Sequence, residues 1–266
     1  MRIDTGTELL LAETDGAVGW LTFNDPARHN TLSLEMQEAI GPVVEAWERD
    51  DAVRVIVMSG AGDRAFVSGA DISEFAENRT APADRERYAA RSGAAWEVWQ
   101  SVDTPVIAMI DGYCIGGGLL MALQADIRIC SERSTFGIPA ARLGLGYGTS
   151  GVRALMQVAG PAVASDMLFS ARRISAADAL GAGLVNRCVA ADELVSTTTG
   201  AAAEIARNAP LTIRACKAAI RAERRRRDDV DDGTVEEMVE ACYRSADYLE
   251  GQAAFLAKRD PVFRGV

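Results

Sequence analysis

Apolar and polar positions repeat with different periods along the chain, and these periods predict a sheet core surrounded by helices. The stretch ELLLAETDGAVGWLTF contains two apolar runs around Asp15-Gly16, a pair that favours a tight turn, and is therefore typical of a β-hairpin. Nearly continuous apolar runs at residues 53–60 and 105–112 are typical of strands buried on both faces.

Helical spacing of apolar residues follows and surrounds these strands. It marks residues 33–50 and 83–102, and Pro42 inside the first stretch is expected to kink or break that helix. A strand-then-helix rhythm continues to about residue 190, and after that the pattern is helical throughout. We therefore expect an α/β core over residues 1–195, followed by a helical region over 196–266 that packs on its own core or on a neighbouring subunit.

Composition and charge narrow the range of partners. The chain has 266 residues, enough for a substantial core, and a formal net charge of −10, which disfavours binding to nucleic acid or to an anionic membrane surface. One basic cluster, Arg221 with residues 224–227, is followed at once by acidic residues, as at a solvated helix end.

The cysteines and the pattern of the N-terminal residues indicate the cellular compartment of the protein. The five cysteines are scattered without a C-x-x-C pair, as expected of buried thiols in a reducing environment. We see no signal-peptide pattern and no apolar run long enough to span a bilayer. The expected location is the cytoplasm.

Histidine is scarce, and this excludes several kinds of site. His29 is the only histidine, so multi-histidine metal sites are excluded and any Ser-His-Asp triad would have to use it. The segment GTSGV lacks the G-x-S-x-G spacing of a nucleophile elbow. Serine and zinc hydrolases are therefore disfavoured.

Two glycine-containing segments follow the two buried strands. AFVSGADISEF and GYCIGGGLL each place glycine at a transition from strand to helix, where free backbone N–H groups point outward. Two such turns side by side would direct two N–H groups at one oxygen atom, which is the arrangement of an oxyanion hole.

Simpler interpretations of the same residues stay open at this point. Gly116, Gly117 and Gly118 also fit a tight turn with close helix–sheet packing, whereas a dinucleotide loop is disfavoured because the G-x-G-x-x-G spacing is absent. Asp71 and Glu74 have the spacing of a helix cap, which favours capping over catalysis.

Several motifs in sequence order resemble one family. FNDPARHNTLS, FVSGADI, PVIAMIDGYCIGGG, ADIRICSERSTFGIPAARLGLGY and YLEGQAAFLAKRDPVF look like the crotonase superfamily, the enoyl-CoA hydratase/isomerase group, almost from end to end. The resemblance implies an α/β fold, a spiral of ββα units with a C-terminal helical region used in trimerisation, and a trimer or a hexamer built as a dimer of trimers. It implies an acyl-CoA thioester as substrate, with coenzyme A as part of that substrate and no separate cofactor or metal.

The resemblance also assigns residues. The N–H groups of Ala70 and Gly117 would bind the thioester oxygen as an enolate forms. Other substrate contacts that it implies are Ala27, Arg28, His29, Ser68, Asp71, Ile72, Ser73, Lys258 and Phe263, the last two reaching coenzyme A of the same or a neighbouring subunit.

The hydratases of the superfamily carry two glutamates, and this chain lacks both. By the resemblance these positions are Leu120 and Ala140 in the substrate pocket. Leu120 lies three residues after Gly117, on the same helix face as the N–H donor. Hydration needs a general base for water and an acid for the α-carbon, and neither side chain can serve. Simple hydration is therefore disfavoured.

Tyr147 in LGLGYG and the C-terminal motif are similar to the methylmalonyl-CoA decarboxylases of the superfamily, although that subgroup commonly has histidine where this chain has Ala70. Decarboxylation reaches the same enolate without a base, because the departing carboxylate leaves its electrons behind. Tyr147 would be protonated at neutral pH, with an ordinary pKa near 10, and could orient the carboxylate or donate to the intermediate. A packed loop aromatic with a satisfied hydroxyl explains Tyr147 equally well.

Two further hypotheses remain. One is double-bond isomerisation, or hydration, with a substituted catalytic group, for which Asp71 and Glu74 are the acids nearest in sequence. The other is an acyl-CoA-binding scaffold that kept the fold and lost the chemistry, since function resides in the site and not in the fold.

Overall fold

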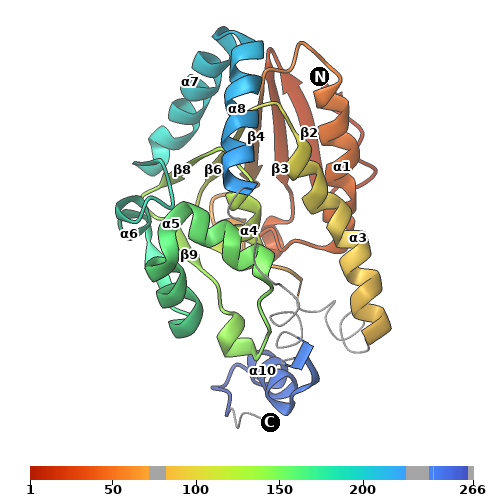
Figure 1. Ribbon diagram of the computed structural model, residues 1–266, viewed down its shortest axis with the longest axis vertical. Coiled ribbons are helices and arrows are strands. Elements are labelled where there is room, and N and C mark those ends of the chain that lie inside the picture. The colour runs from red at the N-terminus through yellow and green to blue at the C-terminus, as the bar shows by residue number, and fades with distance from the viewer. Residues whose placement is uncertain (72–81, 226–239, 242, 263–266) are drawn as a thin grey trace.

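Two β-sheets form the centre of the molecule, and helices enclose them (Figure 1). The computed structural model describes residues 1–71, 82–225, 240–241 and 243–262. The strands of the larger sheet are, in spatial order, β1 (Arg2–Ile3), β2 (Leu10–Asp15), β3 (Val18–Phe23), β4 (Val55–Gly60), β6 (Val106–Ile110), β8 (Ile127–Ser131) and β11 (Arg187–Val189). Those of the smaller sheet are β10 (Arg173–Ser175), β9 (Thr135–Gly137), β7 (Tyr113–Ile115) and β5 (Ala65–Val67).

Helices follow these strand pairs in the sequence. The helices are α1 (Leu34–Glu48), α3 (Pro82–Ser101), α4 (Gly117–Leu123), α5 (Thr149–Ser170), α6 (Ala176–Gly181), α7 (Leu194–Arg207), α8 (Pro210–Arg225) and α10 (Ala246–Leu256), with 3-10 turns η1 (Pro26–Arg28), η3 (Ala140–Leu143) and η4 (Ala191–Glu193). Strands β4, β6 and β8 join the larger sheet, and the strand after each joins the smaller one. Each pair is followed by a helix, α3, α4 or α5. The predicted spiral of ββα units is confirmed.

The N-terminal hairpin forms as expected, with its turn one residue later. Asp15 pairs with Val18, so the loop is Gly16-Ala17, and Gly16 adopts a φ of 56°. From β3 onward the neighbouring strands of the larger sheet are parallel. The side chains of β4 and β6 are buried on both faces, which explains why these two apolar runs are nearly continuous.

Helix α1 differs from the expected break at Pro42. Ser33 caps the helix by accepting a hydrogen bond from the Met36 N–H, and the helix then runs through Pro42 to Glu48. Gly41 precedes the proline and has no β-carbon to meet the proline ring, which removes one of the clashes that normally end a helix there.

Helix α7 packs on one face of the larger sheet. Leu194, Ala201 and Ala202 form a separate buried cluster with Val55 and Val57 of β4 and with neighbouring strand residues. The alternate residues of β4 face the main core on the other side. The first helix after the last strand therefore belongs to the packed body of the protein.

Two later helices complete the body. Lys217 and Arg221 of α8 reach the loop before β6, where they donate to the carbonyl oxygens of Thr104 and Val102 at 2.8 and 2.6 Å. Helix α10 packs against η3, where a β-carbon on Gly251 would lie 2.4 Å from the Leu143 carbonyl carbon. Glycine thus permits this close approach.

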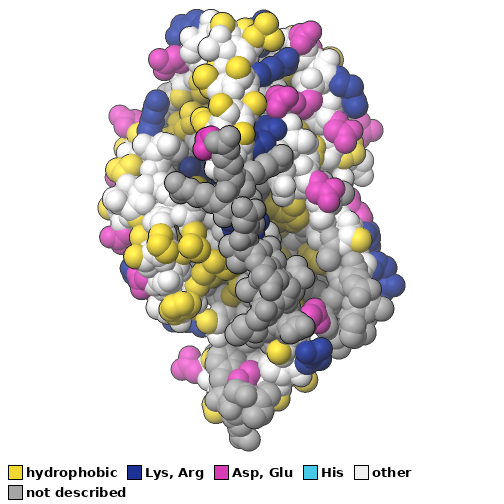
Figure 2. Space-filling model, in the orientation of Figure 1, with side chains coloured by type: hydrophobic (Ala, Val, Ile, Leu, Met, Phe, Trp, Pro, Cys, Tyr) yellow, Lys and Arg dark blue, Asp and Glu magenta, His cyan; other side chains and the backbone are white. Residues whose placement is uncertain are grey.

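Apolar side chains are also exposed on the surface. Figure 2 shows them over α8 and on the α5 side of the molecule. They include Leu211 and Ile220 of α8, and Phe169 of α5, which is 80% exposed. Within the described ranges, no helix is both long and apolar enough to cross a membrane.

Candidate functional site

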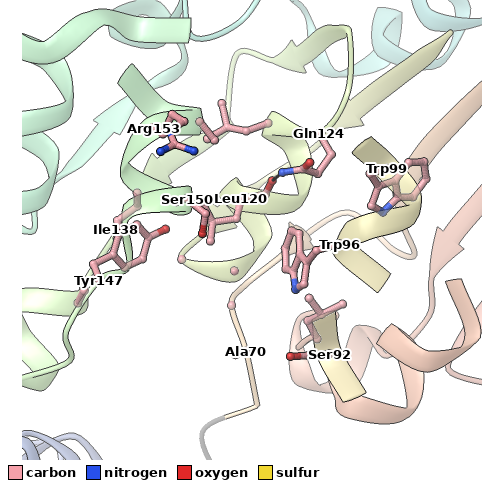
Figure 3. A pocket seen from close by; sticks show the side chains of 18 of the residues that line it. Ala70, Ser92, Trp96, Trp99, Leu120, Gln124, Ile138, Tyr147, Ser150 and Arg153 are labelled. Carbon is pink, nitrogen blue, oxygen red and sulfur yellow. Dashed lines mark hydrogen bonds between the residues drawn. The ribbon is translucent and has the colours of Figure 1, made fainter. Parts of the chain in front are cut away.

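A cleft of about 520 Å³ lies between α3, α4, α5 and α8 (Figure 3). Six of the residues predicted from the sequence line it together, although they come from four separate segments: Ser68, Ala70, Gly117, Leu120, Ala140 and Tyr147. In Figure 3, Tyr147 lies on one side of the cleft and Trp96 and Trp99 lie on the other.

The Ala70 N–H group is oriented by a short parallel bridge to Leu32. The Leu32 N–H donates to the Gly69 carbonyl at 2.8 Å, and the Asp71 N–H donates to the Leu32 carbonyl at 3.3 Å. In this pattern the N–H of the bridged residue itself points to the opposite side. On that side lies Gly117, where a β-carbon would be 3.4 Å from the Ala70 nitrogen.

The Gly117 N–H group is equally available. Gly117 is the first residue of α4, so its N–H has no acceptor within the helix. Neither this N–H nor that of Ala70 donates to a backbone carbonyl in the described part of the chain. Two unpaired N–H groups, adjacent in space, can hold one anionic oxygen.

Each of the three consecutive glycines has its own structural reason. Gly116 has a φ of 55° and a ψ of −117°, a conformation that residues with a β-carbon avoid. At Gly118 a β-carbon would lie 2.0 Å from the Val67 carbonyl oxygen, so glycine allows α4 to pack closely on β5. At Gly117 a β-carbon would make ordinary contacts and would lie 3.4 Å from the Ala70 nitrogen.

Leu120, Ala140 and Tyr147 form an apolar wall beside the N–H pair. Gly151 lets the Tyr147 ring approach, because a β-carbon at that position would lie 2.8 Å from Tyr147 Cε1 and 3.4 Å from Leu120 Cδ2. The Tyr147 hydroxyl is buried and has no hydrogen-bond partner among the described residues. Burial raises the pKa of Tyr147 above its ordinary value, so the phenol stays protonated at neutral pH.

Asp71 is held away from the cleft by an arginine. Its carboxylate accepts a hydrogen bond from Arg28 Nη1 at 2.7 Å, and Asp25 accepts one from Arg28 Nε at 2.7 Å. Asp25, by its hydrogen bond, is the main cause of a raised pKa for the Arg28 guanidinium. Asp71 is not a lining residue of the cleft. The helix that Asp71 was predicted to cap would begin at residue 72, outside the described residues.

The remaining predicted contacts lie around the cleft or beyond the described ranges. Ala27 and Arg28 belong to η1, and the His29 carbonyl accepts a hydrogen bond from the Ser68 N–H at 3.2 Å. None of these three residues lines the cleft. Lys258 is exposed just after α10. Ile72, Ser73, Glu74 and Phe263 lie outside the described residues.

Other lining residues escaped the sequence analysis. Trp96 and Trp99 of α3 form one wall, and Arg153 of α5 and Arg224 of α8 lie in the cleft lining as well. The spacing of Gln124, seven residues after Gly117, is the signal that could have placed it on the same face of α4. The other residues come together only through tertiary packing.

Comparisons with known proteins agree with this architecture. The sequence matches the enoyl-CoA hydratase/isomerase family over residues 13–266. It is 32% identical over 252 residues to the short-chain-enoyl-CoA hydratase of Clostridium acetobutylicum, covering 94% of this chain and 95% of that protein. An enoyl-CoA hydratase/carnithine racemase structure from Magnetospirillum magneticum matches with a TM-score of 0.79 and 34% identity, over 98% of this chain and 97% of that one.

A further similar structure is methylmalonyl-CoA decarboxylase in complex with 2-nitronate-propionyl-CoA. It matches with a TM-score of 0.85 and 28% identity, over 97% of this chain and 99% of that one. The fold and the cleft thus define a ββα-spiral protein whose pocket is built around backbone N–H groups. The chain belongs to the crotonase superfamily, as a member of its enoyl-CoA hydratase/isomerase family.

Proposed function

We propose that this protein is an acyl-CoA enzyme that removes carbon dioxide from a malonyl-type thioester, one with a carboxylate on its α-carbon. One observation carries the proposal. Of the described residues that line the cleft, Asp126 is the only one with a carboxylate. The positions that face the N–H pair and that would hold the two hydratase glutamates are Leu120 and Ala140.

Asp126 is poorly placed to act as a base. It lies beyond the C-terminal end of α4, and its Oδ2 is 2.8 Å from Lys217 Nζ and accepts a hydrogen bond from the Val106 N–H at 2.8 Å. Both contacts involve the same carboxylate oxygen, Oδ2. Among the described residues, no carboxylate is therefore placed to act as a base beside the thioester.

Decarboxylation meets this condition. The bond between the α-carbon and the carboxylate breaks, carbon dioxide leaves, and the electron pair moves onto the thioester oxygen as an enolate. The N–H groups of Ala70 and Gly117 stabilise that oxygen, and one such donor typically contributes about 3–4 kcal/mol. A proton from water then restores the α-carbon. No electrons are gained or lost overall, so the step requires no redox cofactor.

Tyr147 is assigned to the departing carboxylate. Its ring lies beside Leu120, and its hydroxyl is buried without a hydrogen-bond partner among the described residues. As a protonated phenol it can donate a hydrogen bond to a carboxylate oxygen. Because its pKa is raised, the phenol stays protonated at neutral pH and cannot accept a proton, so its role is to orient the carboxylate. The likeness to methylmalonyl-CoA decarboxylase supports the reaction, and the similar hydratases support an acyl-CoA thioester as substrate.

The test is incubation of the purified protein with malonyl-CoA, methylmalonyl-CoA and crotonyl-CoA, followed by mass spectrometry. We expect loss of carbon dioxide, reduced in Tyr147→Phe and unchanged in Tyr113→Phe, a control at an exposed tyrosine outside the cleft. Addition of water to crotonyl-CoA would refute the proposal and indicate a hydratase with a substituted catalytic group.

A scaffold that binds acyl-CoA without chemistry is the second candidate, favoured by the same lack of acids at the N–H pair. Deuterium exchange at the α-carbon of a bound thioester separates the alternatives. A scaffold leaves that position unlabelled and all three esters intact. Isomerisation through Asp71 would label it and would disappear in Asp71→Ala.

We also propose that the protein assembles as a trimer or as a dimer of trimers. Apolar side chains on α10 support this, because Leu249, Phe255 and Leu256 are all more than half exposed on a helix that packs against η3. Exposed apolar clusters commonly mark interaction sites. Light scattering on the purified protein measures the mass directly, and a monomer would refute the proposal.

A further inference from the structure

The length of helix α4 gives an estimate of distances along the cleft. Gly117 and Leu120 lie on one face of this helix, Gln124 is its C-cap residue, and all three line the cavity. At 1.5 Å per residue, Gln124 lies about 10 Å along the helix axis from the Gly117 N–H. An acyl group that follows the cleft lining past Leu120 would therefore reach Gln124.

Cationic side chains gather at the far end of the cleft, around Gln124. Among the described lining residues these are Arg153, Lys217, Arg221 and Arg224. Lys217 pairs with Asp126, and Arg221 pairs with Asp103. The four cations come from α5 and α8, which meet at this end.

Arg224 is positioned by a neutral partner. Its Nε donates to Gln157 Oε1 at 2.9 Å, and Gln157 Nε2 donates back to the Arg224 carbonyl at 3.3 Å. No carboxylate of the described residues forms an ion pair with Arg224, so its charge is not balanced there. Arg153 lies one helical turn before Gln157 on α5, in the same cleft lining.

An unused donor lies on the opposite wall. Trp99 is 4% exposed, and its Nε1–H is buried without a hydrogen-bond partner among the described residues. Figure 3 places its ring beside Gln124 and Trp96. Buried N–H groups are normally paired, so an unpaired donor in a ligand cleft indicates an acceptor supplied by the ligand.

We propose that the acyl group of the substrate ends in a carboxylate, which binds at the far end of the cleft to Arg153, Arg224 and the Trp99 N–H. The substrate class is a coenzyme A thioester whose acyl group carries a carboxylate at its far end, in addition to any carboxylate on the α-carbon. The inference rests on the proposed function in one respect, namely that the thioester binds at the Ala70 and Gly117 N–H groups. It concerns acyl selection and holds whichever reaction occurs at the α-carbon.

The test compares the dissociation constants of adipyl-CoA, hexanoyl-CoA and free coenzyme A by titration calorimetry. These saturated esters differ only in the terminal carboxylate. We expect adipyl-CoA to bind at least about tenfold more tightly than hexanoyl-CoA, as charge-assisted hydrogen bonds would give. We expect Arg153→Gln combined with Arg224→Gln to abolish that difference and leave hexanoyl-CoA binding unchanged.

Two variants sharpen the comparison. Trp99→Phe removes the N–H and keeps an aromatic ring, so we expect a smaller loss confined to adipyl-CoA. Arg172→Gln removes an arginine that pairs with Asp166 on the surface, outside the cleft, and is the matched control. It should leave all three affinities unchanged.

The outcomes separate the two proposals. Equal affinity for adipyl-CoA and hexanoyl-CoA overturns this inference and leaves the acyl-CoA function intact. Equal weakening of all three ligands by the arginine changes also overturns it, and assigns the cations to the phosphates of coenzyme A. If none of the three ligands binds the wild-type protein, the proposed acyl-CoA function itself is wrong.

Discussion

Alanine substituted separately at Gly116, Gly117 and Gly118 should give three different results. At Gly118 the new β-carbon would lie 2.0 Å from the Val67 carbonyl oxygen and 2.7 Å from its carbon. Both are backbone atoms and cannot move independently of β5. Overpacking typically costs about 1–3 kcal/mol, and rigid backbone neighbours place this position at the upper end, so we expect Gly118→Ala to lose stability strongly.

At Gly116 the obstacle is conformational. No atom lies closer than 3.9 Å to a β-carbon there, but the φ of 55° with a ψ of −117° costs a non-glycine residue about 1–3 kcal/mol. We expect Gly116→Ala to fold with a moderately lowered melting temperature.

At Gly117 the fold should survive and the reaction should not. A β-carbon there makes only ordinary contacts, 3.4 Å from the Ala70 nitrogen, and the residue is helical. The methyl group would occupy space beside the N–H pair, where the thioester oxygen is proposed to bind. Loss of one donor in such a pair lowers kcat by about 100- to 1,000-fold, and we expect a loss of that order.

Thermal unfolding and turnover of a malonyl-type thioester, measured on the same preparations, test this series. Gly200→Ala is the control, since nothing lies within 4 Å of a β-carbon there and the residue is inside α7. It should not lower stability or turnover. Wild-type turnover by a folded Gly117→Ala protein would refute the assignment of the N–H pair, and a stable Gly118→Ala protein would refute the packing argument.

Two further predictions concern Tyr147 and Gly251. Burial raises the pKa of Tyr147, so the native protein keeps that proton where the unfolded chain, with a pKa of about 10, loses it. Stability from this source is complete below about pH 10 and declines above it, and chemical unfolding should show a steeper decline in wild type than in Tyr147→Phe. Equal slopes would contradict the burial. Gly251→Ala would place a β-carbon 2.4 Å from the Leu143 carbonyl carbon, so hydrogen exchange should increase in α10 but not in α7; unchanged exchange would contradict the close packing.

Patterns that extend over several residues were readable from the sequence. The hairpin, the parallel strands and the helices all have enough residues for a period to appear. The glycine-rich turns were placed correctly next to each other because both follow neighbouring parallel strands, β4 with β5 and β6 with β7. The resemblance placed Gly117 and Leu120 in the site, and helical spacing put the two residues on the same face of α4.

Short elements and distant contacts were not readable. Strands β5, β7 and β9 have three residues each, too few to show an alternation, although they form the smaller sheet. The residues at the far end of the cleft could not be predicted for another reason. Trp99, Arg153 and Arg224 come from three helices, and only tertiary packing brings them to one cavity.

The pairing of Leu32 with Ala70 has a consequence for how the protein can be studied. The groups at the centre of the cleft belong to the main chain, and one of the two residues is already alanine. An alanine scan would therefore miss half of this centre completely. Replacing the amide of residue 70 with an ester, by chemical ligation or expanded-code translation, removes the donor and leaves every side chain in place. This exchange tests the Ala70 N–H donor directly, which no side-chain substitution can do.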